Sequence, residues 1–203
     1  MKLKIHSLII DEFLDKAEEF RKYAVSRSYE GVRNPQDGVI YPDVTIDIPK
    51  EIQEEILIKL SWVLTPYCEN KHNGADIHPK VMFMRMSKAG VHVPHQAHTD
   101  KNIADYTLLI YLNKDEDCEG GTDILEHIDG QMKIHPQTQE EIDLWKQDTN
   151  VPERWSKVGF CPMKFNRAFI LRSDLFHRSM PINGFGLTPE DSRLVLICFF
   201  NII

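Results

Sequence analysis

Residues 98–125 read HTDKNIADYTLLIYLNKDEDCEGGTDIL, and this stretch decides how the rest of the sequence is interpreted. It opens on His98 and Asp100, which are two residues apart. At the extended spacing of a strand, such residues point to the same side, so their side chains can act together. A β-rich segment, 105–113, follows them, and then an acidic turn that ends in a Gly-Gly pair. The pattern predicts an imidazole and a carboxylate next to a strand of the core.

Short strands are also predicted along the rest of the chain beyond residue 77. The segments are β-rich and bounded by turn formers: 81–86, 105–113, 120–128, 167–172 and 192–200. In the last one both faces are apolar, as in a strand buried between two layers, yet Arg193 heads one face. A buried arginine needs an anion, and its planar fork suits a carboxylate. An ion pair with a carboxylate of the protein itself is the alternative.

The first 76 residues predict helices. Apolar residues recur at helical spacing within 11–24, and Pro49 opens a second amphipathic helix that ends near Pro66. Between them, segment 31–48 is rich in turn formers and predicts a loop with room for one strand. Helices followed by many short strands favour helices packed on a β-sandwich or an open barrel.

Segment 136–156 breaks the strand pattern because it is polar and helix-prone, so an insertion over about 131–160 is expected between two strands. It carries Trp145 and Trp155. We expect 31–48 and 131–160 to flank the mouth of the barrel, with 131–160 forming part of a rim that orders on substrate binding. The alternative is a surface helix whose tryptophans pack on the core.

Composition limits the class of protein. The chain has 203 residues, which suggests one domain over 1–203, and its formal charge of −7 argues against a nucleic-acid binder. The 4 cysteines are isolated from one another, unlike a zinc site or a disulfide framework. No apolar run is long enough for a signal peptide or a membrane span. A soluble cytoplasmic protein with no membrane partner is expected, and the oligomeric state stays open.

A third candidate ligand, His177, follows the 167–172 strand and a Ser173-Asp174 turn. Two imidazoles and one carboxylate on one face form the ligand set of non-haem Fe(II) oxygenases. The chain has 9 histidines, so an HxD motif also arises by chance. A histidine at the position of His177 can equally be a hydrogen-bonded core residue.

The joint order of these motifs over about residues 81–200 resembles the Fe(II)/2-oxoglutarate-dependent dioxygenases, in particular the prolyl-4-hydroxylase-like branch. In that branch HxD precedes a strand ending in YLN, an acidic loop and a GG pair, and a distal His and a basic residue come later. The resemblance implies a mainly β (α+β) fold. Its double-stranded β-helix, or jelly-roll, core would span 77–203, with supporting helices in 1–76.

Carried over by position, the resemblance implies His98, Asp100 and His177 as iron ligands. It implies Arg193 as the partner of the distal carboxylate of 2-oxoglutarate, and Tyr111 as a hydrogen-bond donor to the same carboxylate. The implied cofactors are Fe(II), 2-oxoglutarate and O2, with ascorbate supporting activity.

The implied reaction hydroxylates an unactivated C–H bond and releases succinate and CO2. The expected substrate is a prolyl or other amino-acid side chain in a peptide or protein, or a free amino acid. Two alternatives stay open: a nucleic-acid dealkylase of the same superfamily, and a non-catalytic cupin-like module that binds a metal or a partner.

The sequence departs from the family pattern in three places: the first removes a usual cosubstrate contact, and the last bears on the substrate more than on the cofactor chemistry. Met86 and Ser87 precede Gly90 where the family often has Tyr-x-x-x-Gly, and Asn166 stands where a Pro-x-x-Gly motif ends in glycine. Asparagine tolerates the left-handed backbone that such a glycine supplies. The link between His177 and Arg193 is longer than in the nearest prolyl hydroxylases.

Overall fold

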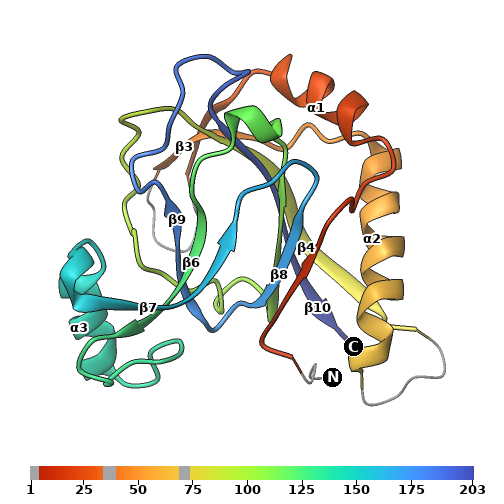
Figure 1. Ribbon diagram of the computed structural model, residues 1–203. Helices are drawn as coiled ribbons and strands as arrows, with labels where there is room; N and C mark the ends of the chain where they lie inside the picture. Colours follow the sequence, from red (N-terminus) through yellow and green to blue (C-terminus); the bar gives the residue numbers. More distant parts are fainter. Residues whose placement is uncertain (1–4, 34–39, 69–73) are drawn as a thin grey trace.

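The computed structural model describes residues 5–33, 40–68 and 74–203, and these residues are mostly β (Figure 1). One antiparallel sheet has the strand order β1-β8-β5-β10-β4-β3-β2, and a smaller one has the order β7-β6-β9. The strands are β1 (Ser7–Ile10), β2 (Glu30–Arg33), β3 (Ile40–Thr45), β4 (Ile77–Ser87), β5 (Tyr106–Tyr111), β6 (Gly121–His127), β7 (Trp155–Pro162), β8 (Ala168–Arg172), β9 (Phe176–Met180) and β10 (Arg193–Ile202). The α-helices are α1 (Ala17–Val25), α2 (Lys50–Leu64) and α3 (Gln139–Asp148).

Strand β10 lies in the middle of the large sheet, between β5 and β4, and is buried on both faces as its sequence predicts. On one face, Leu194, Leu196, Cys198 and Phe200 pack in the core shared with α1 and α2. The other face, which begins with Arg193, is turned toward the small sheet and its pocket. The strand therefore carries both the helix-side core and one wall of the site.

Helix α2 covers the large sheet through one stripe of side chains at intervals of four residues: Ile52, Ile56, Leu60 and Leu64. These positions share one face of a helix, which is why the stripe is buried. The helix follows Pro49 and ends at Leu64, close to the predicted end near Pro66, and a 3-10 turn at Thr65–Tyr67 continues it. Figure 1 places α3 on the opposite side of the molecule from α2.

The N-terminal part is less helical than predicted. It also supplies edge strands on both sides of the large sheet, because β1 pairs with β8 and β3 pairs with β4. The segment expected to be a loop with one strand, 31–48, contains most of β2 and the whole of β3 in its described residues, whereas 34–39 lies outside them. Strands β7 and β9 were not predicted either. The division of the chain into domains stays a prediction.

The expected first helix over 11–24 begins only at Ala17 because the residues before it are bound to Asn166. Phe13 N donates to the Asn166 carbonyl at 3.0 Å, Leu14 N donates to Asn166 Oδ1 at 2.8 Å, and Asn166 Nδ2 donates to the Leu14 carbonyl at 2.9 Å. Asn166 has a φ of 57°, so the left-handed turn expected at this position is confirmed. This residue fastens the N-terminal segment to the turn before β8.

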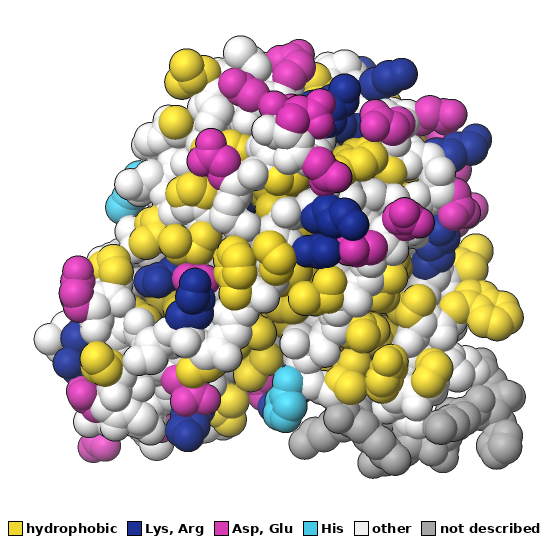
Figure 2. All heavy atoms as spheres, viewed as in Figure 1, with side chains coloured by type: hydrophobic (Ala, Val, Ile, Leu, Met, Phe, Trp, Pro, Cys, Tyr) yellow, Lys and Arg dark blue, Asp and Glu magenta, His cyan; other side chains and the backbone are white. Residues whose placement is uncertain are grey.

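Figure 2 shows acidic and basic side chains interspersed over one face of the molecule, with hydrophobic side chains between them. No helix in the described part of the chain combines the length and the apolar character needed to cross a membrane.

We predict that Asn166→Ala lowers the free energy of unfolding by about 2–4 kcal/mol, because it leaves a buried N–H and a buried C=O of Leu14 without partners. Urea denaturation measures the change. The exposed Asn183 provides the control, since Asn183→Ala should stay within about 0.5 kcal/mol of the parent. A loss below about 1 kcal/mol for Asn166→Ala would contradict the role given to its side chain.

Candidate functional site

Two backbone hydrogen bonds bring the distant histidines together. His98 N donates to the His177 carbonyl at 3.1 Å, and His177 N donates to the His98 carbonyl at 2.9 Å. This isolated antiparallel bridge adds the segment at His98 to β9, at the edge of the small sheet. Paired residues in an antiparallel bridge point to the same side. The two imidazole rings therefore lie 4.5 Å apart, centre to centre.

The Nε2 atoms of the two histidines face Asp100. His177 Nε2 lies 3.2 Å from Asp100 Oδ2, and His98 Nε2 lies 3.9 Å from Oδ1. Both Nδ1 atoms donate to backbone carbonyls, that of Gln96 at 3.2 Å and that of Leu175 at 3.0 Å. Such bonds fix the tautomer that leaves Nε2 with a free lone pair, as metal-ligating histidines require. The possible ligand atoms of the three residues all lie within 4.8 Å of one another.

Asp100 is held by the strands behind it. Its backbone N donates to the Ser173 carbonyl at 2.8 Å, and Thr107 Oγ1 donates to Oδ2 at 3.1 Å. The Thr107 and Ser173 hydroxyls are also hydrogen bonded, at 2.8 Å. Thr107 lies on β5 and Ser173 follows β8, so two strands of the large sheet orient this carboxylate.

Electrostatics in the cluster favour one ionised carboxylate and one neutral imidazole. Burial and the neighbouring His177 lower the pKa of His98 to about 4, so its ring is neutral at physiological pH. Burial alone would lower the pKa of His177, but the Asp100 carboxylate raises it above the usual value. Burial would raise the pKa of Asp100, but His177 and His98 together with the Thr107 hydroxyl hold it below the usual value. A divalent cation would satisfy the carboxylate and both Nε2 atoms at once.

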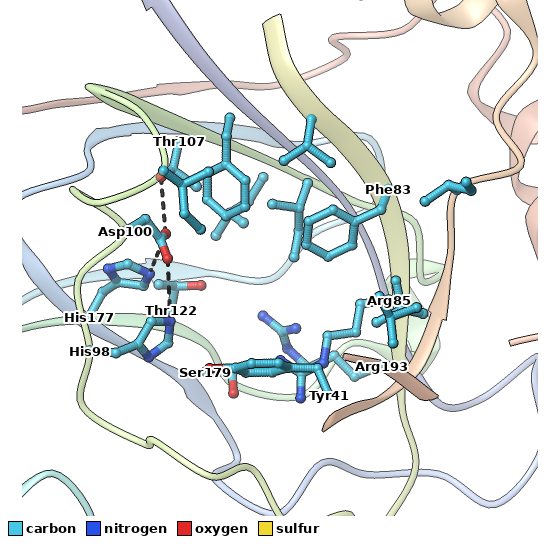
Figure 3. A pocket seen from close by; sticks show the side chains of 18 of the residues that line it. Tyr41, Phe83, Arg85, His98, Asp100, Thr107, Thr122, His177, Ser179 and Arg193 are labelled. Carbon is cyan, nitrogen blue, oxygen red and sulfur yellow. Dashed lines mark hydrogen bonds and ion pairs between the residues drawn. The ribbon is translucent and has the colours of Figure 1, made fainter. Parts of the chain in front are cut away.

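The cluster opens into a cavity of about 390 Å³ between the two sheets. Figure 3 shows His98, Asp100 and His177 converging at one side of it, with Arg85, Tyr41 and Arg193 toward the other. Most of the remaining lining is aliphatic or aromatic: Val32, Val44, Ile46, Val81, Phe83, Ile103, Leu109, Ile197 and Phe199. The cavity therefore combines an apolar wall with a small set of polar groups, as ligand sites generally do.

Arg193 lines this cavity, whereas Tyr111 does not. Arg193 is 5% exposed, its Nε is buried without a hydrogen-bond partner, and burial lowers its pKa to about 10, so it stays charged at neutral pH. Its Cζ lies 5.9 Å from the centre of the Tyr111 ring. The Tyr111 hydroxyl is hydrogen bonded to Thr122 Oγ1 at 2.8 Å, and it is the Thr122 side chain that lines the cavity. Among the described residues, no protein carboxylate forms an ion pair with Arg193.

Sequence reasoning missed several further polar groups of the cavity, among them Arg85 and Thr122. Arg85 lies within the apolar strand sequence VMFMRM, and a single arginine in such a run is a signal that could have been used. Thr122 follows the Gly-Gly pair, and nothing in the local sequence distinguishes it from an ordinary strand threonine.

The inserted segment supports His98 and contributes none of the cavity-lining residues, whereas five of those come from 32–46. Trp145 Nε1 and Thr149 Oγ1 both donate to the Ala97 carbonyl, at 2.8 and 2.7 Å, and Ala97 N donates to the Thr149 carbonyl at 2.9 Å. Trp155 is 5% exposed and packs on Phe176 in a small core. Both tryptophans therefore pack on the rest of the fold, as in the alternative of a surface helix whose tryptophans pack on the core. The end of α3 and Thr149 thus hold Ala97, the residue directly before His98, through three hydrogen bonds, and this set of bonds is called the clamp on Ala97.

Solved structures with a similar fold share little sequence identity with this chain. A prolyl hydroxylase from Trichoplax adhaerens, in complex with a hypoxia inducible factor peptide fragment, is 14% identical with a TM-score of 0.51, over 97% of this chain and 84% of the other. The epimerase SnoN, in complex with Fe3+, alpha ketoglutarate and nogalamycin RO, is 11% identical with a TM-score of 0.54, over 96% and 78%. EvdO2 from Micromonospora carbonacea var. aurantiaca, complexed with 2-oxoglutarate, is 12% identical with a TM-score of 0.54, over 96% and 86%.

The chain therefore has a mostly antiparallel, jelly-roll-like β fold that it shares with these proteins. It belongs to the family of unknown function DUF6445, whose model matches residues 2–200. No curated protein matches it.

We predict that Thr107→Val weakens the affinity of the His98–Asp100–His177 cluster for a divalent metal about 10- to 100-fold, the usual effect of removing a group that orients a ligand. The substitution keeps the shape of the side chain and removes only the hydroxyl bound to Asp100. Titration with Zn(II) against a competing chelator measures the change. Thr122→Val is the matched control because its hydroxyl is bound to Tyr111, and it should keep the parent affinity. Equal affinities for Thr107→Val and the parent would refute the orienting role.

Proposed function

We propose that this protein is an Fe(II)- and 2-oxoglutarate-dependent oxygenase that hydroxylates an unactivated C–H bond. One observation supports the proposal most strongly. A single cavity holds a His–Asp–His cluster with metal-ligand geometry and, across from it, a buried arginine with no anionic partner among the described residues. The first feature fits a metal with open positions, and the second fits the far carboxylate of a dicarboxylic acid.

The residues present fit the implied metal. His98 and His177 would bind Fe(II) through Nε2, and Asp100 through a carboxylate oxygen, which makes the two-histidine, one-carboxylate set of non-haem iron oxygenases. The bonds from Nδ1 to backbone carbonyls and from Thr107 to Asp100 would hold the three ligands in place. Arg193 would bind the distal carboxylate of 2-oxoglutarate. Tyr111 would support Arg193 with its ring and orient Thr122 with its hydroxyl.

The remaining residues would keep the reaction inside the cavity. When bound, iron, 2-oxoglutarate and O2 supply an oxidant that attacks a C–H bond, with conversion of 2-oxoglutarate to succinate and CO2. Phe83, Ile197 and Phe199 exclude water from that region and hold an apolar substrate group beside the histidines. We propose an amino-acid side chain, prolyl or another, in a peptide or in a free amino acid, as the group oxidised.

The finer structural assignments belong to the same proposal. The pairing of His98 with β9, opposite the large sheet, supports a double-stranded β-helix core. The order of motifs supports the prolyl-4-hydroxylase-like branch. The interspersed charges on the face in Figure 2 and the formal charge of −7 disfavour the nucleic-acid dealkylase, which needs a cationic groove.

The decisive experiment measures succinate formed from 2-oxoglutarate under air, with and without Fe(II), in the presence of ascorbate. A pool of peptides and amino acids serves as the substrate source, and mass spectrometry detects the gain of one oxygen. His177→Ala and Asp100→Ala should remove iron-dependent succinate formation. A parent protein that binds iron and 2-oxoglutarate but forms no succinate with or without the pool would support the non-catalytic module instead.

We predict that Arg193→Met weakens the binding of 2-oxoglutarate to the Zn(II)-loaded protein at least tens-fold. Removing one partner of a buried charge pair typically costs about 2–5 kcal/mol. Tyr111→Phe should have a smaller effect, because its hydroxyl faces Thr122. Calorimetry measures both, and Arg27→Met, at a surface arginine outside the cavity, is the control. If Arg193→Met binds 2-oxoglutarate as the parent does, the cosubstrate lies elsewhere.

A further inference from the structure

The cavity contains a second arginine that the proposed cofactors do not use. Arg85 lies on β4, and its Nε and Nη2 atoms are buried without a hydrogen-bond partner. Among the described residues, its guanidinium forms no ion pair. Its Cζ lies 5.8 Å from the centre of the Tyr41 ring, which is the β3 side of the cavity. Figure 3 shows Arg85 and Arg193 as neighbours in the part of the cavity away from the histidines.

The two arginines are placed for different ligands. In the strand pairing, Arg193 is opposite Ser87 and next to Tyr111, toward β5, whereas Arg85 is opposite Val195 and next to Tyr41, toward β3. Arg193 is 5% exposed, and Arg85 is more exposed as a residue although its Nε and Nη2 atoms are buried. A ligand of Arg193 would therefore lie toward β5, and a ligand of Arg85 would lie toward β3.

An apolar wall runs along the same face of the sheet as Arg85. Every second residue of β4 lies on this face: Val81, Phe83 and Arg85. In the pairing with β10, Val81 is opposite Phe199 and Phe83 is opposite Ile197. The Phe83 and Phe199 rings are 5.9 Å apart, centre to centre. At a rise of about 3.4 Å per residue, Arg85 lies about 7 Å along the strand from Phe83. The surface therefore offers one cationic end and one apolar end.

The sum of the charges in the proposed site indicates that Arg85 would bind a further anion. In the proposed enzyme, Fe(II), Asp100, the dianion of 2-oxoglutarate and Arg193 together carry no net charge. Among the described residues, Arg85 then remains as a positive charge without an ion-pair partner in a largely apolar cavity. Asp43 attracts it at longer range without forming an ion pair, and Arg33 adds a further positive group to the lining. A buried unpaired charge is unfavourable, so an anion that binds here gains more than it would in water.

We propose that Arg85 binds the carboxylate of the substrate, and that the substrate is a carboxylic acid whose apolar body lies along Phe83, Ile197 and Phe199. This inference rests on the proposed function and narrows its substrate. The molecule oxidised carries a free carboxylate, as an amino acid, an acylated amino acid or a peptide C-terminus does, in contrast to a residue inside a chain. The guanidinium fork fixes the carboxylate, and the wall places the apolar carbons toward the histidines.

Two other roles for Arg85 give different outcomes in the test. It could be a structural group that only stacks on Tyr41, in which case no anion is bound. It could also share the distal carboxylate of 2-oxoglutarate with Arg193, in which case its removal weakens cosubstrate binding.

The experiment titrates Zn(II)-loaded protein, saturated with 2-oxoglutarate, with 4-phenylbutyrate and with the neutral 4-phenylbutyramide. Zinc occupies the cluster without supporting turnover, so calorimetry reads binding alone. We expect the carboxylate to bind the parent protein at least tenfold more tightly than the amide. Arg85→Met should remove that preference and leave the affinity for the amide within threefold. Arg85→Gln serves in its place if Arg85→Met does not fold, and Arg27→Met is the charge-matched surface control.

Three results would overturn the inference: no preference for the carboxylate in the parent, a preference that persists in Arg85→Met, or a loss of 2-oxoglutarate affinity in Arg85→Met as large as that in Arg193→Met. The proposed function fails separately, if the Zn(II)-loaded parent does not bind 2-oxoglutarate at all. In that event the same pair of titrations without 2-oxoglutarate still decides whether Arg85 selects a carboxylate.

Discussion

The pair of backbone hydrogen bonds between His98 and His177 is the constraint on which the site depends. It joins a loop to β9 across 79 residues of sequence and sets both imidazoles on one side of the bridge. The next bond, from Asp100 N to the Ser173 carbonyl, continues the attachment and presents the carboxylate to the same point. Main-chain pairing thus fixes the position of all three side chains, and the side-chain hydrogen bonds only complete their orientation. A shift of register by one residue would turn these side chains to the opposite face.

The interior of the cavity has the opposite charge character to the chain as a whole. The formal charge of the chain is −7, yet the cavity gathers Arg33, Arg85 and Arg193 around an apolar wall, and Asp100 is the one acidic residue among its described lining residues. Low polarity around these groups strengthens their attraction for anions. The arrangement therefore favours small anionic molecules with an apolar part over a polyanion, which would need positive charge on the outside.

The sequence predicts the centre of this structure better than its edges. Strand β10 alternates two apolar faces headed by Arg193, and α2 repeats apolar residues every fourth position, so both patterns are visible without a structure. The grouping of His98, Asp100 and His177 was likewise expected from the order of the motifs and the family resemblance, and the structure brings the three side chains together. Strand β1 has only four residues, too few for a period to be recognised. Strand β9 reads FHRSM, which lacks β-branched residues and is held by pairing with β6.

Long-range contacts account for the remaining differences. Helix α1 begins later than its apolar spacing predicts because Asn166, more than 140 residues away, binds the backbone in front of it. The importance of Arg85 likewise depends on Tyr41 and Val195, which come next to it only in the folded sheet. No local pattern contains this information, because these interactions form between segments that are distant in sequence.

The clamp on Ala97 has a thermodynamic consequence for α3. This helix has ten residues and buries only Asp148, so its own packing stabilises it weakly, and it relies on the capping box at Thr138 and on its contacts with the loop before His98. A ligand that binds through His98 orders that loop, and by reciprocity it must also stabilise the helix that holds the loop. Amide hydrogen exchange in α3 would then slow when the cluster is loaded with metal, which makes a peripheral helix a reporter of metal occupancy.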